Sequence, residues 1–472
     1  MNSNYKRLIN STLILSIGII CTKVLTFLLV PFYTRWLTQS DYGIYDLIIT
    51  YTSLIIPVIT LDLGEALFRF TLERLDDEDK VKTVVSTVIK YVIVFYGCGI
   101  IIGIPILSRF VDFKLAGMIG VLLFVEIFNN IFMMLMRGQK KLTTYAASSI
   151  VFILTTFVLN FIFLKLLNLG LNGIVLAYII GYSASILFMF FMGKTHRYLS
   201  FSSTDTNILK EMLKYSLPLI PNAVAWWIMD ASDRTIITTF LGVTTSAILA
   251  VAHKVPNICH TMYSVFHLSW QENASDTINL SKEERDNYYN GVLNNMLSIL
   301  LTIQIVVISC NFLFYKIMVR EEYFPGYYQS PILVVALTFS MIAQFIGGIY
   351  IATKETKKNG FTTLLSAIIN VLLHLVLVKI IGIYAATIST LISYIILLAM
   401  RWLDIKKTID LKVSNKNILY FGVLLYFFAS IYFNSLVLNC INLALGCSLF
   451  VIVNRAIIKK AFNGALSKLH HK

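Results

Sequence analysis

Runs of about 20 apolar residues recur from one end of the chain to the other, and they constrain its fold more than any other feature. Each run is long enough for a helix to cross the hydrocarbon core of a bilayer. Because lipid offers no hydrogen-bond partners, each run must form a helix that satisfies its own backbone. The 472-residue chain is 57% hydrophobic and 14% charged, with a mean hydropathy of +0.76. We therefore predict an all-α polytopic membrane protein.

We predict about fourteen transmembrane helices, the length of each run being the criterion. Their centres lie near Ile19, Leu54, Val94, Glu126, Thr156, Ile180, Ile228, Val255, Ser298, Met341, Ile369, Ser393, Tyr426 and Leu445. When alternate loops are assigned to opposite sides, one side holds about four times as many Lys and Arg residues, including Arg137 and Arg401. Cations stay in the cytoplasm, so both termini are predicted to be cytoplasmic. The net charge of +14 is assigned to these loops, and no nucleic-acid partner is predicted.

An internal repeat divides the chain. Between Phe27 and Glu65 the sequence predicts an apolar helix ending in an aromatic and cationic collar that includes Arg35, a short polar elbow at Gln39–Gly43, and a second apolar helix. The pattern returns between Asp233 and Pro256. Internal repeats are typical of transporters, whose substrate site lies between the repeats. We predict an N-lobe with helices 1–6 over residues 1–200, a C-lobe with helices 7–12 over 201–410, and helices 13–14 over 411–472.

Prolines occur in the first two spans of each half, and proline removes a helical hydrogen bond and promotes kinks. They are Pro31 and Pro57, then Pro218, Pro221 and Pro256. Two interpretations stay open, namely hinges on which the halves rock and tolerated kinks without function. Aromatic residues at helix ends, such as Trp270, are interpreted as part of a belt at the membrane surface.

Charged residues inside the apolar runs are the candidate functional residues, because a charge in the membrane is costly unless it is paired or faces water. They are Lys23, Glu126, Asp230 and Lys254 near the predicted midplane, Asp233 and Arg234 nearer the outer side, and Asp62 near the inner side. Asp230 and Arg234 have the spacing to pair on one helix face. One interpretation is a set of buried ion pairs that fix helix register. The other, which we favour, is a polar cavity between the halves.

His253, His260 and His267 recur every seven residues and are predicted to share one stripe of a helix. The stripe is interpreted either as a proton relay or wet cavity wall, or as hydrogen bonding between helices. Separations of two turns do not suit a metal site, and the six scattered cysteines show no metal or disulfide spacing. The Gly193-Lys194-Thr195 sequence lacks the upstream glycine of a phosphate loop, so ATP is not predicted as a cofactor. With no catalytic motif and no loop long enough for a catalytic domain, the chain is not predicted to be an enzyme.

Several stretches together resemble the polysaccharide flippases of the MOP (multidrug, oligosaccharidyl-lipid, polysaccharide) exporter superfamily. They are VPFYTRWLTQSDYGIYDL, DRTIITTFLG, HKVPNI, SWQENAS and NVLLHLVLVKIIGIYAATISTLISY. The resemblance implies two six-helix lobes around a V-shaped cavity, plus two C-terminal helices, in a bacterial plasma membrane. It implies alternating access that carries polyprenyl-diphosphate-linked oligosaccharide from the inner to the outer leaflet. The implied partners are this substrate, membrane lipids and the polysaccharide polymerase machinery.

A diphosphate head group needs cations, and the resemblance places one in the first and one in the eighth helix, where this chain has Lys23 and Lys254. Arg234 and Arg35 are predicted to assist them. The candidates for ion coupling or charge pairing are Asp62, Glu126, Asp230, Asp233 and His253. Three other interpretations stay open: a lipid II flippase for peptidoglycan, a drug/cation antiporter of the same superfamily, and a membrane-bound glycan polymerase or ligase.

Overall fold

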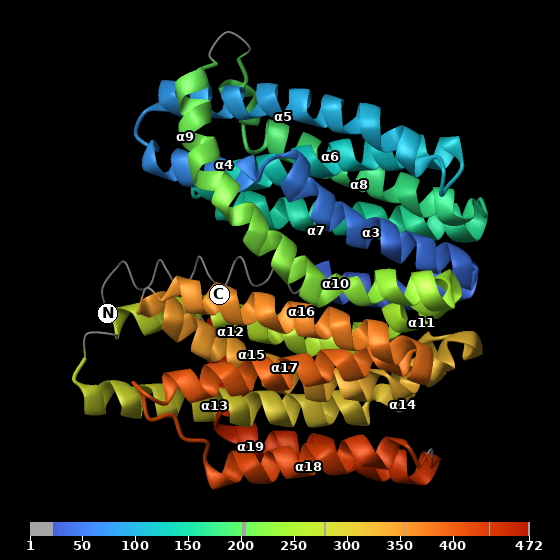
Figure 1. Ribbon diagram of the computed structural model, residues 1–472, viewed down its shortest axis with the longest axis vertical. Helices are drawn as coiled ribbons and strands as arrows, with labels where there is room; N and C mark the ends of the chain where they lie inside the picture. The colour runs from blue at the N-terminus through green and yellow to red at the C-terminus, as the bar shows by residue number, and fades with distance from the viewer. Residues whose placement is uncertain (1–21, 201–203, 278–279, 354, 434, 471–472) are drawn as a thin grey trace. The chain divides into compact units, whose positions relative to one another are not determined.

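The computed structural model describes residues 22–470 apart from 201–203, 278–279, 354 and 434. Every regular element in that part of the chain is a helix (Figure 1). The chain divides into two compact units, Met1–Ala231 and Ser232–Lys472. The division falls inside α10 (Ile220–Leu241).

The N-terminal unit is built from long helices joined by short turns. Its elements are α2 (Val30–Trp36), α3 (Gln39–Ile59), α4 (Leu63–Glu73), α5 (Glu78–Leu107), α6 (Phe113–Gly138), α7 (Leu142–Asn160), the π-helical turn η1 (Phe161–Leu166), α8 (Gly170–Phe191), the 3₁₀ turn η2 (Thr195–Tyr198), α9 (Thr206–Ser216), η3 (Leu217–Leu219) and the first half of α10.

The C-terminal unit continues from α10. Its elements are α11 (Val243–Ala252), α12 (Lys254–Asp276), α13 (Lys282–Ser309), α14 (Asn311–Leu313), the π-helical turn η4 (Phe314–Met318), the 3₁₀ segment η5 (Glu321–Tyr328), α15 (Ser330–Ala352), α16 (Thr356–Ile381), α17 (Tyr384–Ile405), α18 (Asn415–Ile431) and α19 (Leu436–His470).

The expected spans coincide with these helices. Ten helices of the described chain are long and apolar enough to cross a membrane. Each expected centre from Leu54 onward falls within a helix, and Ile19 lies outside the described residues. The other described spans are too polar or too short to be counted among these ten. α10 carries charged residues, the α11–α12 span is interrupted at His253, and α18 has 17 residues. The prediction of an all-α polytopic membrane protein is confirmed.

The same helix pairs pack together in each unit, as the sequence repeat requires. In the N-terminal unit α6 packs against α4 and α8, and α7 packs against α8. In the C-terminal unit α15 packs against α12 and α17, and α16 packs against α17. Both final pairs are joined at a glycine with left-handed backbone, Gly170 at φ 54° and Gly382 at φ 58°. Only glycine adopts a positive φ without steric cost, so both turns place a glycine where the backbone requires one.

The first elbow differs from the sequence prediction. Gln39–Gly43 is not a polar elbow, because α3 already begins at Gln39 and the break is confined to Leu37 and Thr38. The Thr38 hydroxyl accepts a hydrogen bond from the Asp41 backbone N–H at 3.0 Å. Polar residues that follow such a cap belong to the first helical turn, where their side chains remain compatible with the helix.

The predicted kinks lie next to the prolines. After Pro57, α3 ends, and Leu61 and Asp62 both adopt left-handed backbone, with φ of 50° and 54°. The Ser216 hydroxyl donates to the Leu61 carbonyl at 2.7 Å and so satisfies a group that the helix break exposes. In the C-terminal unit the break between α11 and α12 lies just before Pro256. A hinge role for these breaks stays a prediction.

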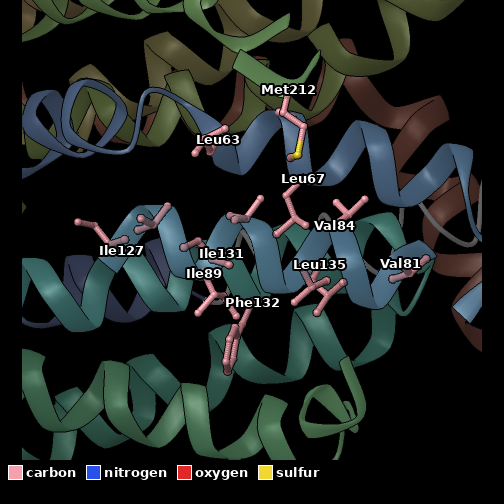
Figure 2. Packing of buried hydrophobic residues seen from close by; sticks show 14 of the residues in the cluster. Leu63, Leu67, Val81, Val84, Ile89, Ile127, Ile131, Phe132, Leu135 and Met212 are labelled. Carbon is pink, nitrogen blue, oxygen red and sulfur yellow. The ribbon is translucent and has the colours of Figure 1, made fainter. Parts of the chain in front are cut away.

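A close-packed apolar core holds the N-terminal unit together (Figure 2). Figure 2 shows Leu63 and Leu67 of α4 facing Ile131 and Leu135 of α6 across tightly spaced side chains. Residues of α5 and Met212 of α9 also belong to the cluster. The amphipathic α9 therefore packs on α4 and α5 and contributes to the core of the unit.

Two residues expected at the membrane surface are buried instead. Trp270 is 1% exposed, its ring stacks on Phe345 at 4.1 Å between centroids, and its Nε1 donates to the Phe345 carbonyl at 2.8 Å. It is therefore a core residue, and the prediction of a surface belt is wrong for it. Gly348 leaves room for this indole, since a Cβ there would lie 2.7 Å from it.

Arg401 was expected among solvated loop cations, and that prediction is also wrong, since it is 1% exposed in the C-terminal unit. Its guanidinium donates to the carbonyls of Ala343 at 2.7 Å and Asn359 at 3.1 Å, and to the hydroxyls of Thr362 at 3.0 Å and Thr363 at 2.8 Å. Arginine has donors enough to bridge several helices in this way. Arg401 thus joins α15, α16 and α17.

A ladder of asparagines on α13 fixes the extended segment between α17 and α18. Asn290 donates to the Asp410 carbonyl at 2.8 Å and accepts from the Lys412 N–H at 2.6 Å. Asn294 donates to the Lys412 carbonyl at 2.9 Å and accepts from the Ser414 N–H at 2.7 Å. Four residues advance a helix by about 6 Å, and two residues advance an extended segment by about the same distance. Asn290 and Asn294, one helical turn apart, therefore line up with alternate residues of the segment.

We expect the Asn290→Ala, Asn294→Ala double variant to loosen this segment. It removes the four hydrogen bonds to the backbone of this segment, each contributing about 1 kcal/mol. Trypsin should then cleave after Lys406, Lys407 or Lys412 several times faster than in the unaltered protein. Asn287→Ala is the matched control, because Asn287 is exposed on the same helix. Equal cleavage rates in all three proteins would refute the role of the ladder.

Both termini remain predicted to be cytoplasmic, because the excess of cations on that side persists without Arg401. A reporter fused after Lys472 and another inserted between Lys194 and Lys210 should both report a cytoplasmic position. An external signal from either would contradict the topology.

Candidate functional site

The polar centre of the C-terminal unit is built around Asp233. This carboxylate is 2% exposed on α10, and its Oδ1 lies 2.8 Å from Nδ1 of His374 on α16. Its Oδ2 accepts a hydrogen bond from the Thr390 hydroxyl of α17 at 2.9 Å. Three helices therefore converge on one buried carboxylate. A carboxylate at such a depth is tolerated only with partners of this kind.

Further polar side chains extend this centre between α16 and α17. Asn370 donates to the Thr390 hydroxyl at 3.2 Å and to the Ser393 hydroxyl at 3.3 Å. The Asn370 Oδ1 and the His374 Nε2 are buried and have no hydrogen-bond partner among the described residues. Buried polar groups are normally satisfied, so these two atoms mark a place where a proton, water or ion can enter the network.

A group of cations lies at the break in the second elbow of the same unit. Gly242, with φ 89°, separates α10 from α11, and His253 separates α11 from α12. The charges of Arg234 on α10 and Lys254 on α12 both act on the His253 ring. Three nitrogen-rich side chains thus gather at one helix break, and all three are half-buried.

The N-terminal unit contains an acidic and aromatic centre. Glu126 lies midway along α6, and its Oε1 accepts from the Tyr182 hydroxyl of α8 at 3.2 Å. The Thr52 side chain of α3 lies beside the same carboxylate. The Tyr45 and Tyr178 hydroxyls are 2.6 Å apart in the same unit. Hydroxyl groups thus surround the one carboxylate that α6 carries within its span.

The other predicted residues lie apart from these centres. Lys23 and Arg35 are exposed at the first helix of the N-terminal unit. Asp62 is half-buried at the start of α4. The side chain of Asp230 lies outside the described residues, and so does its predicted ion pair with Arg234. Asp233 pairs with a histidine that the sequence analysis did not single out.

For His267, the structure agrees with the interpretation of the stripe as hydrogen bonding between helices. His267 Nε2 lies 3.2 Å from the Gln344 carbonyl of α15. His260 is exposed, and His253 sits at the helix break rather than within a continuous helix. The three histidines therefore do not share one continuous helix, as the prediction of a single stripe requires.

His374 and Tyr182 are the functional candidates that sequence reasoning missed. His374 was detectable, because it is a polar side chain in an apolar helix, four residues after Asn370. Tyr182 carries no such signal, since tyrosine is common in apolar helices. Only the packing of α8 against α6 brings its hydroxyl to Glu126.

Surface hollows do not coincide with these centres. One of about 690 Å³ is lined by residues of α13 and the segment before α18. Asn290 and Asn294 in its wall are already engaged in the asparagine ladder. No group of side chains suited to a metal ion occurs among the described residues.

Comparison with known proteins decides the family. The sequence profile of a family described as "Polysaccharide biosynthesis protein" matches residues 8–267, more than half of the chain. The chain belongs to this family. No curated protein matches it.

Solved structures with the same fold are transporters and flippases. The lipid II flippase MurJ in an inward closed conformation has a TM-score of 0.70 at 16% identity, covering 95% of this chain and 100% of its own. An inward-facing multidrug resistance MATE family transporter of the MOP superfamily gives 0.68 at 15%, covering 85% and 95%. A MOP superfamily transporter from Pyrococcus furiosus gives 0.61 at 15%, covering 88% and 96%. At these identities the likeness concerns the fold, and it confirms the MOP resemblance.

We expect Asp233→Ala to destabilise this polysaccharide biosynthesis protein strongly. The His374 imidazole and the Thr390 hydroxyl would lose their buried acceptor, at a cost of about 3 kcal/mol. Thermal unfolding of the purified protein and its abundance in membranes measure the effect. The Asp233→Leu, His374→Leu double variant should recover part of the lost stability, because it removes both partners. A double variant as unstable as the sum of its single variants would contradict the pairing.

Proposed function

We propose that this protein carries polyprenyl-diphosphate-linked oligosaccharide repeat units from the inner to the outer leaflet of the bacterial plasma membrane. It does so by alternating access during polysaccharide biosynthesis. Membership of the polysaccharide biosynthesis family supports the pathway. A fold shared with flippases and transporters supports movement of a substrate across the membrane, by analogy.

The observation that carries the proposal is the cationic group at the second elbow. The charges of Arg234 and Lys254 both reach His253, so two cations from different helices gather at one helix break. A diphosphate is the kind of ligand that such a group stabilises. Lys23 and Arg35, two exposed cations near the start of the N-terminal unit, are proposed as further phosphate ligands.

The membrane potential supplies a driving force that needs no ATP site. Moving one negative charge outward across an inside-negative membrane is favourable by about 2.3 kcal/mol per 100 mV. A diphosphate with two charges gains roughly twice as much.

Ion coupling is assigned in the first place to Asp233. Its partner His374 and the unsatisfied atoms nearby give a proton or cation a place to bind. Glu126, with its surrounding hydroxyls, is the second candidate, and Asp62, Asp230 and His253 follow. The Asp233→Leu, His374→Leu protein separates coupling from stability, because a coupling role predicts restored abundance without restored export.

Lys254→Ala and Arg234→Ala should each abolish export while membrane abundance stays normal. Each variant removes a charge that is proposed to bind the diphosphate. Lys254→Arg should retain part of the activity, since charge matters more than shape for a mobile head group. The measurement is the lipid-linked oligosaccharide that accumulates in a strain lacking the native gene, normalised to protein abundance.

Lys379→Ala provides the matched control, because it removes an exposed cation at the end of α16, 5.7 Å from the Phe240 ring. It should export normally. Full export by a protein lacking both Lys254 and Arg234 would refute the proposal.

Accumulation of peptidoglycan precursors, or sensitivity to cationic drugs without loss of polysaccharide, would instead identify a lipid II flippase or a drug antiporter. Crosslinking to a polysaccharide polymerase in the same strain tests the proposed partner.

A further inference from the structure

Two turns of the N-terminal unit are tied together by a lysine. The first turn, after α6, contains Lys140 and Lys141, and the second, after α8, contains Gly193 and Lys194. Lys141 Nζ donates to the Gly193 carbonyl at 2.8 Å. The ends of α6, α7 and α8 therefore meet at one place on the surface of this unit.

Cations converge at this place. The charges of Lys194 and Arg197 add to the effect of burial in lowering the pKa of Lys141. Glu78, at the start of α5, opposes them less strongly. Lys140, Lys194 and Arg197 are all exposed, so their charges face the surroundings. We call Lys140, Lys141, Lys194 and Arg197 the basic turn cluster.

The backbone of the basic turn cluster is unusual. Lys140 and Lys194 both adopt left-handed conformation, with φ of 57° and 56°. That conformation favours glycine or asparagine, and a lysine there is under steric strain. Strained residues persist where their side chains have a role, and here both strained residues carry the same charge.

Apolar side chains lie directly beside these cations. Phe191 and Met192, the last residues before Gly193, are 62% and 68% exposed. Phe191 is the last residue of α8, a candidate membrane span, and Met192 comes directly after it, so both side chains are placed to contact acyl chains. Acyl-facing residues next to four cations match the two parts of an anionic lipid, its tails and its phosphate.

We propose that the basic turn cluster binds the head group of an anionic phospholipid at the membrane surface. Lys194 and Arg197 contact the phosphate, Lys140 adds charge, and Lys141 positions the second turn through Gly193. Phe191 and Met192 contact the acyl chains. The site belongs to the N-terminal unit alone and does not depend on the proposed transport function.

The test compares bound lipid in the purified full-length protein. We expect native mass spectra to retain phosphatidylglycerol on the unaltered protein in preference to phosphatidylcholine, and thermal unfolding to shift upward with the former only. The Lys194→Asn, Arg197→Gln variant should lose affinity for phosphatidylglycerol by roughly tenfold or more, because two charges near an anionic surface are removed. Asparagine at 194 suits the left-handed backbone, so the variant should fold at least as well without lipid.

Matched variants make the result specific. Lys194→Arg should keep the lipid preference. Lys210→Gln, Lys214→Gln removes two exposed cations from α9 of the same unit and should also keep it. Unchanged phosphatidylglycerol binding by Lys194→Asn, Arg197→Gln would overturn the proposal. So would an equal loss in the α9 variant, or an equal thermal shift with inorganic phosphate alone, which would indicate a simple anion site.

Discussion

The absence of water from the bilayer core is the constraint on which the rest of the structure depends. Each backbone N–H and C=O there must find a partner within the protein, so the chain is helical throughout its described spans. Where a helix is broken, another group has to replace the lost hydrogen bond. Ser216 does this for the carbonyl of Leu61 after α3. The break after α3 is thus local, and a side chain replaces the hydrogen bond that it loses. The functional candidates lie near helix breaks and near carboxylates within helices.

The two units share a scaffold but differ in chemistry. The same pairs of helices pack in each, and a glycine with positive φ joins the last two helices of each repeat. The carboxylate of the N-terminal unit, Glu126, is held by a tyrosine. That of the C-terminal unit, Asp233, is held by a histidine and a threonine. Duplicated halves can therefore carry different polar centres while they keep common packing.

The sequence predicts the helices well because apolar runs of sufficient length have one outcome in lipid. It predicts their ends less well, since Gln39–Gly43 reads equally as an elbow and as a capped first turn until the Thr38 hydrogen bond is seen. The sequence alone does not predict which distant segments contact each other. Asp233 and His374 are 141 residues apart in sequence, and only the packing of α10 on α16 joins them. The prediction that Arg401 is a solvated loop cation was wrong for the same reason, because its hydrogen-bond acceptors come from two other helices.

Two arginines of the C-terminal unit show how a structural charge differs from a functional one. Arg401 is buried, and its donors reach four oxygen atoms on α15 and α16, so its charge is stabilised in the resting protein. Arg234 and Lys254, in contrast, lie on different helices and both act on the half-buried His253. Two cations from different helices at one break can stabilise an anionic ligand together, whereas the charge of Arg401 is already taken up by neighbouring oxygens. Under the proposed function that ligand is the diphosphate of the lipid-linked oligosaccharide.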